Sequence, residues 1–569
     1  MSTYQFKTPP KISDTQIPFA LTSKAFKKWL DSLSTKPDNE QAHQILLAIQ
    51  AINTESSLLP EKKSALLIGI YQETLVFLKP LKNNILNSAL PLTSEELCDV
   101  EHIVWIYAEL ANSFEHCMTK KSNATNAVTF YFGIQSLITA YLYISAVYEA
   151  PYANFWKQSY LFYGTACQLN LHDLSIDLGE QRSSTVSHAF KHLIALYHCD
   201  LHQFRPRTIL QVSSCIEKHT SSMLLDTKFS EKRSSLYSAL NLNSDLPPTH
   251  LNRLDKTEKK ALRFFHGFNA AAEIFKYSSQ EAQGNGTLKL INNKALLQAA
   301  KSLSQSKKRR FTRLSENRDH DGIIGLDNII QTLRHDSSLV INQKKKKRNG
   351  YQTTSGGWSV PDLNLVSEGY ESIDAMKALL SDEATTKSNT AQAKHLMSIS
   401  SRDEVWPSKH TTSAIMPTTE APLSIIDSSI KGYKIELNLT NSNIRVQLGD
   451  IIGLKNKNSY EIGIIHRATL QTKDKVQLNI KLLSFESELT YLSTPKNDSV
   501  KTWALLLPSN KAPGSADSVI FNDSHFKCGE YIFLNRADTK PHSYKLQKLL
   551  HINSAASHIE LLSAPIIGQ

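Results

Sequence analysis

The sequence predicts a multidomain α+β protein, in which an all-α helical domain is followed by an antiparallel β-barrel. Two observations predict this order. Apolar side chains recur every three or four residues across 21–225, and the spacing changes to two from Gly432 onward. The chain has 569 residues, which at about 150 residues per domain suggests two to four domains. An apolar fraction of 41% is sufficient for buried cores.

The helical domain is predicted over residues 21–290, after a disordered N-terminus at 1–20. Its first helix follows "LTSKAFKKWLDSL", where Thr22 is a typical N-cap. The segment "TSEELCDVEHIVWIYAELANSF" opens with an acidic first turn, which suits the positive end of a helix dipole. Residues 256–275, "KTEKKALRFFHGFNAAAEIF", continue the helical spacing. We therefore expect helices almost throughout this region.

The longest apolar stretch, residues 130–150, is interrupted by Gln135, Ser136, Thr139 and Ser145. These polar residues favour a buried helix over a membrane span. The N-terminus has no signal-peptide pattern, and the six cysteines form no CxxC pair or disulfide framework. We predict a cytoplasmic protein without membrane insertion.

The β-rich part is predicted from short alternating runs. Ile435, Leu437 and Leu439 form one such run, and Val476, Leu478 and Ile480 form another. Turn sequences such as "LGD" and "TKDK" separate these runs. We assign barrel strands to 431–490 and a second small β unit to 491–569, which either forms its own barrel or completes the first. Residues 371–430 are rich in Ser, Thr, Ala and Pro and are predicted to be a flexible insert or linker.

Positive charge is concentrated between these regions. Residues 301–350 hold thirteen Lys and Arg against five Asp and Glu, a large share of the net charge of +11. Arg309, Arg310 and Arg313 lie here, and an arginine side chain can donate two parallel hydrogen bonds to a phosphate or to a guanine edge. The residues alone also allow a solvated linker. A second run, Lys344 to Gly350, allows bulk binding to nucleic acid or acidic lipid, or a solvated loop.

No catalytic motif is present in the sequence, so an enzyme is not predicted, and neither is a cofactor. His188, His192, Cys199 and His202 would share one face of a straight helix. Only the first two lie within one turn, as zinc ligands from a single helix must. We interpret this face as a packing surface and predict no metal site.

A resemblance is carried by two motifs of the basic region and its surroundings. Arg309 and Arg313 form RxxxR, and "WSVPDLNLVSEGYES" at 358–372 contains a variant of [D/N]xSxxG. With the later segments "VQLGDIIGL" and "YEIGIIHRA", they resemble the PilZ domain, a small β-barrel that binds cyclic di-GMP. The whole chain is similar to gammaproteobacterial PilZ proteins that have a long N-terminal helical domain. By this resemblance residues 300–370 hold the basic segment and the start of a PilZ-like barrel.

The resemblance implies that Arg309, Arg313 and the adjacent Arg310 contact the phosphates and guanine edges of cyclic di-GMP. It places Asn364 and Gly369 on the second motif, where an Asn amide can contact a base edge. Val366 replaces the motif Ser, and 51 residues separate Arg313 from Asn364, more than in simple PilZ domains. Both departures bear on whether nucleotide binding survives.

The implied function is a non-enzymatic cyclic di-GMP effector. Nucleotide binding in the barrel would control an unknown protein partner of the helical domain, in type IV pilus motility, surface adhesion or biofilm formation. Two alternatives remain open: a degenerate PilZ scaffold that binds proteins without nucleotide, and a basic nucleic-acid-binding protein. For the effector we expect no DNA partner.

Overall fold

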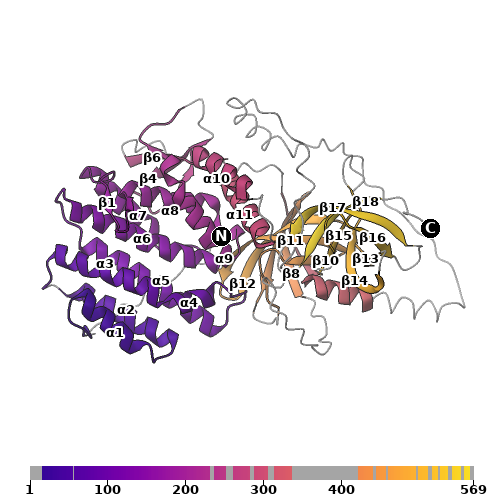
Figure 1. The fold of residues 1–569 in the computed structure, drawn as a ribbon, viewed down its shortest axis with the longest axis horizontal. Helices are drawn as coiled ribbons and strands as arrows, with labels where there is room; N and C mark the ends of the chain where they lie inside the picture. The colour runs from indigo at the N-terminus through magenta and orange to yellow at the C-terminus, as the bar shows by residue number, and fades with distance from the viewer. Residues whose placement is uncertain are drawn as a thin grey trace, which may run out of the picture.

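The computed structural model describes residues 16–335 and 421–563. Gaps fall at 56, 231–235, 252–260, 282–286 and 305–312, and at 440–443, 457–458, 495–496, 510–515, 523–525, 536–540 and 553–555. Most of the predicted disordered N-terminus and most of the predicted insert lie outside the described residues. Figure 1 shows the two parts of the chain side by side, helices in indigo and magenta, strands in orange and yellow.

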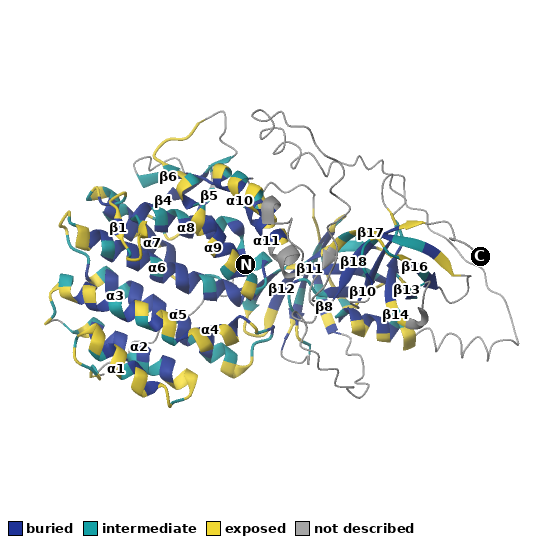
Figure 2. Cartoon of the chain, viewed as in Figure 1, coloured by how far each residue is buried: buried dark blue, intermediate teal, exposed yellow. Residues whose placement is uncertain are grey.

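The helical domain is built around a buried pair, α5 (Ser94–His116) and α6 (Ala124–Ala146). Its other helices are α1 (Ser23–Leu33), α2 (Asp38–Thr54), α3 (Pro60–Phe77), α4 (Lys79–Ile85), α7 (Phe155–Gln168), α8 (Val186–Cys199), α9 (Pro206–Lys218), α10 (Phe268–Glu281) and α11 (Thr287–Ser304), with short 3-10 turns η1 (Leu201–Gln203) and η2 (Thr220–Ser222). Thr22 caps α1 as the sequence predicted, since its hydroxyl accepts from the Ala25 amide at 3.2 Å. Figure 2 shows the dark blue of buried residues concentrated on α5, α6 and α8.

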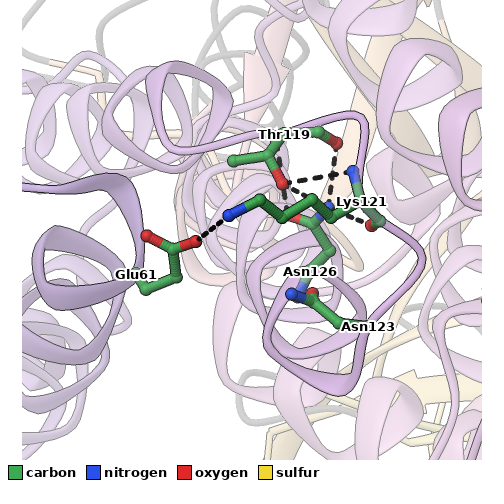
Figure 3. Close-up of polar contacts among 5 residues, drawn as sticks. All are labelled: Glu61, Thr119, Lys121, Asn123 and Asn126. Atoms are coloured by element: carbon green, nitrogen blue, oxygen red, sulfur yellow. Dashed lines mark hydrogen bonds and ion pairs between the residues drawn. The ribbon is translucent and has the colours of Figure 1, made fainter.

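Helix α6 begins in a polar loop that fixes its first turn. The Asn123 side chain accepts from the Asn126 amide at 2.9 Å, and Asn126 Nδ2 donates to the carbonyls of Thr119 and Lys121 (Figure 3). Lys121 then pairs with Glu61 of α3 at 3.0 Å. Among the described helices α6 alone is long and apolar enough to cross a membrane, and 83% of its most apolar window is buried inside the protein. It is the core helix that its interrupting polar residues indicated.

The helical domain also contains short strands that the sequence did not predict. A four-stranded sheet has the order β3 (Leu224–Asp226), β6 (Leu262–His266), β4 (Ser238–Asn241), β5 (Thr249–His250). The strands β1 (Ile176–Asp177) and β2 (Ser183–Ser184) form a separate ribbon. The helix predicted over 256–275 is therefore wrong over 262–266, and its residues 256–260 lie outside the described ranges. Phe264 and Phe265 are both buried in β6, and α10 begins only after Gly267.

The first barrel is closed, with strand order β10-β11-β12-β9-β8-β7. The strands are β7 (Leu314–Ile324), β8 (Ala421–Ser429), β9 (Gly432–Asn438), β10 (Ile451–Asn456), β11 (Ser459–Thr472) and β12 (Lys475–Ser484). Strand β8 lies inside the segment predicted as insert, 371–430, so the C-terminal end of that segment must be corrected. Ala421, Leu423 and Ile425 alternate toward the core, but Pro422 and the neighbouring serines gave these residues the composition of a linker.

The second barrel is also closed, with strand order β13-β14-β15-β18-β17-β16. Its strands are β13 (Glu488–Thr494), β14 (Asn497–Leu507), β15 (Ser518–Phe521), β16 (Tyr531–Asn535), β17 (His542–Ile552) and β18 (Ser557–Ser563). Residues 326–335 are helical, and Leu326, Ile329 and Ile330 fill a shared core with Ile462 of β11 and Leu505 of β14. The predicted fold class, helices followed by a barrel with a second β unit, is confirmed, and the second unit is a barrel of its own.

The helical domain contacts the first barrel through backbone hydrogen bonds and through two residues that pack into the barrel core. Leu90 and Val446 exchange backbone hydrogen bonds of 3.1 and 2.7 Å, and the Leu470 amide donates to the Tyr148 carbonyl at 2.9 Å. Leu90 and Tyr148 also pack among the barrel's interior residues. The two domains are therefore joined by direct contacts between the helices and the barrel.

Candidate functional site: a basic face of the first barrel

Arg313 immediately precedes β7 and lies over the neighbouring strand β8. The pairing of Leu314 with Ser428 sets this position. Arg313 Nη1 donates to Oδ1 and Oδ2 of Asp427 at 2.8 and 3.0 Å, and about a third of each side chain or less is exposed, 34% for Arg313 and 21% for Asp427. The guanidinium is thus held against the barrel while part of it stays open to solvent. A group in this state can exchange its carboxylate for a phosphate.

Strand register continues this polar face across the barrel. Asp427 pairs with Lys434 of β9, Lys434 with Asn479 of β12, and Asn479 with Arg467 of β11. The neighbours Ile435, Leu478 and Ile480 point into the core, so the paired polar side chains stand on the outside. We call Arg313, Asp427, Lys434, His466, Arg467, Asn479 and Lys481 the basic face.

His466 lies within this face, and the pKa of its imidazole indicates how much positive charge surrounds it. Its Nδ1–H donates to the Asn479 carbonyl at 2.6 Å. Burial lowers the pKa of His466, and the positive charges of Arg467, Lys481 and Arg313 lower it further. These three cations are therefore within electrostatic range of one imidazole. Such a concentration of positive charge with an amide and a guanidinium suits a phosphate joined to a nucleobase.

The basic face reaches the helical domain at Arg467. Arg467 Nε donates to both carboxylate oxygens of Asp200, at 3.3 and 3.1 Å, and Asp200 sits in a left-handed conformation where α8 ends. Nearby, Arg205 Nε donates to the Leu448 carbonyl at 2.6 Å, and its Nη2 lies 3.8 Å from Asp450. The basic face is thus connected through Arg467 to the helices.

Of the residues that the sequence nominated, the structure describes Arg313 alone. Arg309, Arg310, Asn364, Gly369 and Val366 lie outside the described residues, as does the run from Lys344 to Gly350. The sequence analysis did not nominate the remaining members of the basic face. For Lys434, Asn479 and Lys481 the only signal is that "YKIELN" and "VQLNIKLL" place polar residues between core positions, which is typical of any half-exposed strand.

The face predicted for one straight helix forms only in part, since His188, His192 and Cys199 lie on α8 and His202 does not. Helix α8 ends at Cys199, and His202 lies in η1. His192 is buried, its Nε2 lies 3.1 Å from the Ser213 carbonyl, and burial lowers its pKa to about 3. His202 Nε2–H donates to the Glu149 carbonyl at 3.0 Å. Within the described ranges no group of three metal-ligating side chains is present.

Comparison with known families identifies the chain. Residues 24–229 match the model of the N-terminal domain of the cyclic-di-GMP receptor FimW, and residues 238–488 match the model of its middle PilZ domain. The second match begins at β4 and ends where the second barrel starts. No curated protein and no solved structure matches the chain significantly. The two domain models follow one another over most of the sequence and confirm the resemblance to PilZ proteins with a long helical domain. The chain belongs to the FimW family of cyclic di-GMP receptors.

Proposed function

We propose that this chain binds cyclic di-GMP on the basic face of its first barrel and passes the binding signal to its helical domain. The observation that carries the proposal is the position of Arg313. The RxxxR spacing of the resemblance assigns it to the ligand. Arg313 pairs with Asp427, and the strand register continues from Asp427 through Lys434 to Asn479. A cyclic dinucleotide has two phosphodiesters and two guanines, so it needs both cations and hydrogen-bonding groups at one surface.

Arg309 and Arg310 precede Arg313 closely in the chain, and we propose that they contact the same ligand. Asn364 and Gly369 are proposed to complete the site, the first through its amide and the second by allowing close backbone approach. Val366 removes one hydroxyl from this set. A single neutral hydrogen bond is worth only about 1 kcal/mol, so the arginines can sustain binding without it.

The same ligand would act on the helices through Arg467. This side chain is paired with Asn479 on the basic face and with Asp200 of the helical domain. A phosphate near Asn479 competes with Asp200 for Arg467 and so changes the domain contact. We propose a non-enzymatic cytoplasmic effector whose helical domain binds a protein partner, in the control of type IV pili, surface motility or biofilm formation.

The test is calorimetric titration of cyclic di-GMP into the full chain, with GTP and GMP as controls. Arg313→Ala is expected to weaken binding at least about tenfold, because it removes a charged hydrogen-bonding group. Arg318→Ala is the matched control: Arg318 lies on β7, pairs with Glu316 at 2.9 Å and is 56% exposed. Binding lost in both variants alike, or no binding by the folded wild-type chain, would instead favour a scaffold that works without nucleotide.

A further inference from the structure

A second group of cations meets where α11 crosses the first barrel. Lys294 and Lys301 are seven residues apart on α11, two helical turns, so they lie on one face. Leu296, Ala299, Ala300 and Leu303 turn toward the helical core. Both lysines keep solvent-accessible surface, although neighbouring atoms partly desolvate Lys294. Hydrogen bonds link α11 to the barrel: Gln298 of α11 donates to Gln203 of η1 at 2.9 Å, and Gln203 and Arg467 of β11 both donate to Asp200.

The barrel supplies two more lysines to the same place. Lys481 stands on the outer surface of β12, two positions from Asn479 and so on the same side of the strand. Gly432 pairs with Lys481, and Lys431 precedes that glycine in the turn between β8 and β9. The Leu482 amide donates to the Lys431 carbonyl at 2.9 Å, which fixes this turn against β12. We call Lys294, Lys301, Lys431 and Lys481 the lysine cluster.

These side chains repel one another. Burial lowers the pKa of Lys481, and the charges of Lys431 and Lys301 lower it further. Burial and Lys481 together lower the pKa of Lys294 to about 8. His558 of β18 also has a pKa lowered to about 4, first by burial and then by Lys481 and Lys294. The second barrel therefore also borders the cluster, and added positive charge is unfavourable at this point.

The lysine cluster is continuous with the basic face. Lys481 belongs to both, and it lowers the pKa of His466 together with Arg313. An anion held by the lysines would consequently lie next to the proposed dinucleotide site. Four ammonium groups from a helix, a turn and a strand can surround a phosphate without the planar geometry that arginine requires.

We propose that Lys294, Lys301, Lys431 and Lys481 form a phosphate subsite that holds one phosphodiester of the bound cyclic dinucleotide against helix α11. This inference rests on the proposed binding of cyclic di-GMP to the basic face. It adds that the ligand touches the helical domain directly. Ligand binding then removes the repulsion between α11 and the barrel, so the dinucleotide strengthens the domain contact at α11 while it competes with Asp200 at Arg467.

The experiment compares two double variants of the full chain that lose the same charge. Lys294→Gln with Lys301→Gln removes the α11 lysines, and Lys24→Gln with Lys28→Gln removes two exposed lysines of α1, at the far end of the helical domain in Figure 1. Circular dichroism verifies folding. Cyclic di-GMP and pyrophosphate are each titrated into wild type, both double variants, Lys481→Gln and Arg313→Ala.

We expect cyclic di-GMP to bind about tenfold or more weakly to Lys294→Gln/Lys301→Gln and to Lys481→Gln, and within about twofold of wild type to the α1 variant. Pyrophosphate binding that needs the cluster and survives Arg313→Ala would also support a separate phosphate subsite. Unchanged affinity for the dinucleotide in the α11 variant, with loss in Arg313→Ala, overturns the subsite and keeps the proposed function. Lysine-dependent pyrophosphate binding without any dinucleotide binding overturns the dinucleotide as the source of the phosphate, and binding of neither overturns both.

Discussion

Arg313 and Asp427 form an ion pair that joins the residue before β7 to strand β8, with Nη1 of the arginine 2.8 Å from Oδ1 and 3.0 Å from Oδ2 of the carboxylate. This pair neutralises the arginine that we propose contacts cyclic di-GMP. By this proposal a phosphate would have to displace Asp427 before it could accept from the same Arg313 donor, and the ion pair would lower the affinity for the dinucleotide.

Replacing Asp427 with Asn is expected to tighten cyclic di-GMP binding by about threefold to fivefold, because a partly exposed ion pair is worth up to about 1 kcal/mol. Calorimetry at fixed salt measures this change. Glu436→Gln is the control, since Glu436 pairs with Lys475 at 2.8 Å on the same barrel. Weaker binding by Asp427→Asn would show instead that the carboxylate itself contacts the ligand, as an acceptor for a guanine edge.

The pH dependence of binding should report on Lys294. Its pKa is lowered to about 8, so in the free protein it begins to lose its proton within the usable pH range. Only the charged form attracts phosphate, and binding is therefore expected to weaken as the pH rises above about 8 and to take up protons there. Titrations at pH 8.5 in two buffers of different ionisation enthalpy measure that uptake. Lys294→Arg should keep the affinity at pH 9, and an identical pH profile in both proteins would contradict a role for Lys294.

The ion pair between Arg467 and Asp200 should hold the helical domain on the barrel. Arg467→Ala is expected to weaken the contact by roughly 1 kcal/mol, since the pair is only partly exposed, 34% and 17%. Hydrogen exchange resolves this locally, because the Leu470 amide donates across the interface to Tyr148. Its exchange should become about fivefold faster. Lys475→Gln removes an exposed pair on the same barrel and should leave Leu470 unchanged.

The sequence predicted the elements whose apolar spacing persists over several turns or pairs. Helices α1, α5 and α6 and strands β9, β11 and β12 follow from that spacing. The strands β3 to β6 are two to five residues long, too short to show a period, and Phe264 and Phe265 fit a helix equally well. Strand β8 was not predicted, because its serines and Pro422 are typical of a linker.

The candidate site could be predicted only where a local motif marks it. Arg313 belongs to such a motif. Asp427 and Asn479 have no motif of their own, and they come near Arg313 because β8, β9 and β12 pair in one particular register. Register depends on barrel closure, which no short segment of sequence encodes. The contribution of Lys294 depends further on how α11 docks, a property of the whole fold.

A final prediction concerns Glu149, which is 1% exposed beside the interface residue Tyr148. Its Oε2 has no hydrogen-bond partner among the residues that the structure describes, and burial raises its pKa to about 7. The neutral acid is therefore favoured in the folded state. The stability contributed by the neutral Glu149 is full below the unfolded pKa of 4.5 and is lost as the pH rises through about 7.

Glu149→Gln removes this dependence, and the variant should gain roughly 2 kcal/mol over wild type between pH 5 and pH 8. Urea unfolding at both pH values measures the difference, with Glu180→Gln, at an 85% exposed side chain, as the control. A gain that is equal at both pH values would mean that Glu149 is already ionised in the folded protein at pH 5, and that burial does not hold it neutral at the domain contact.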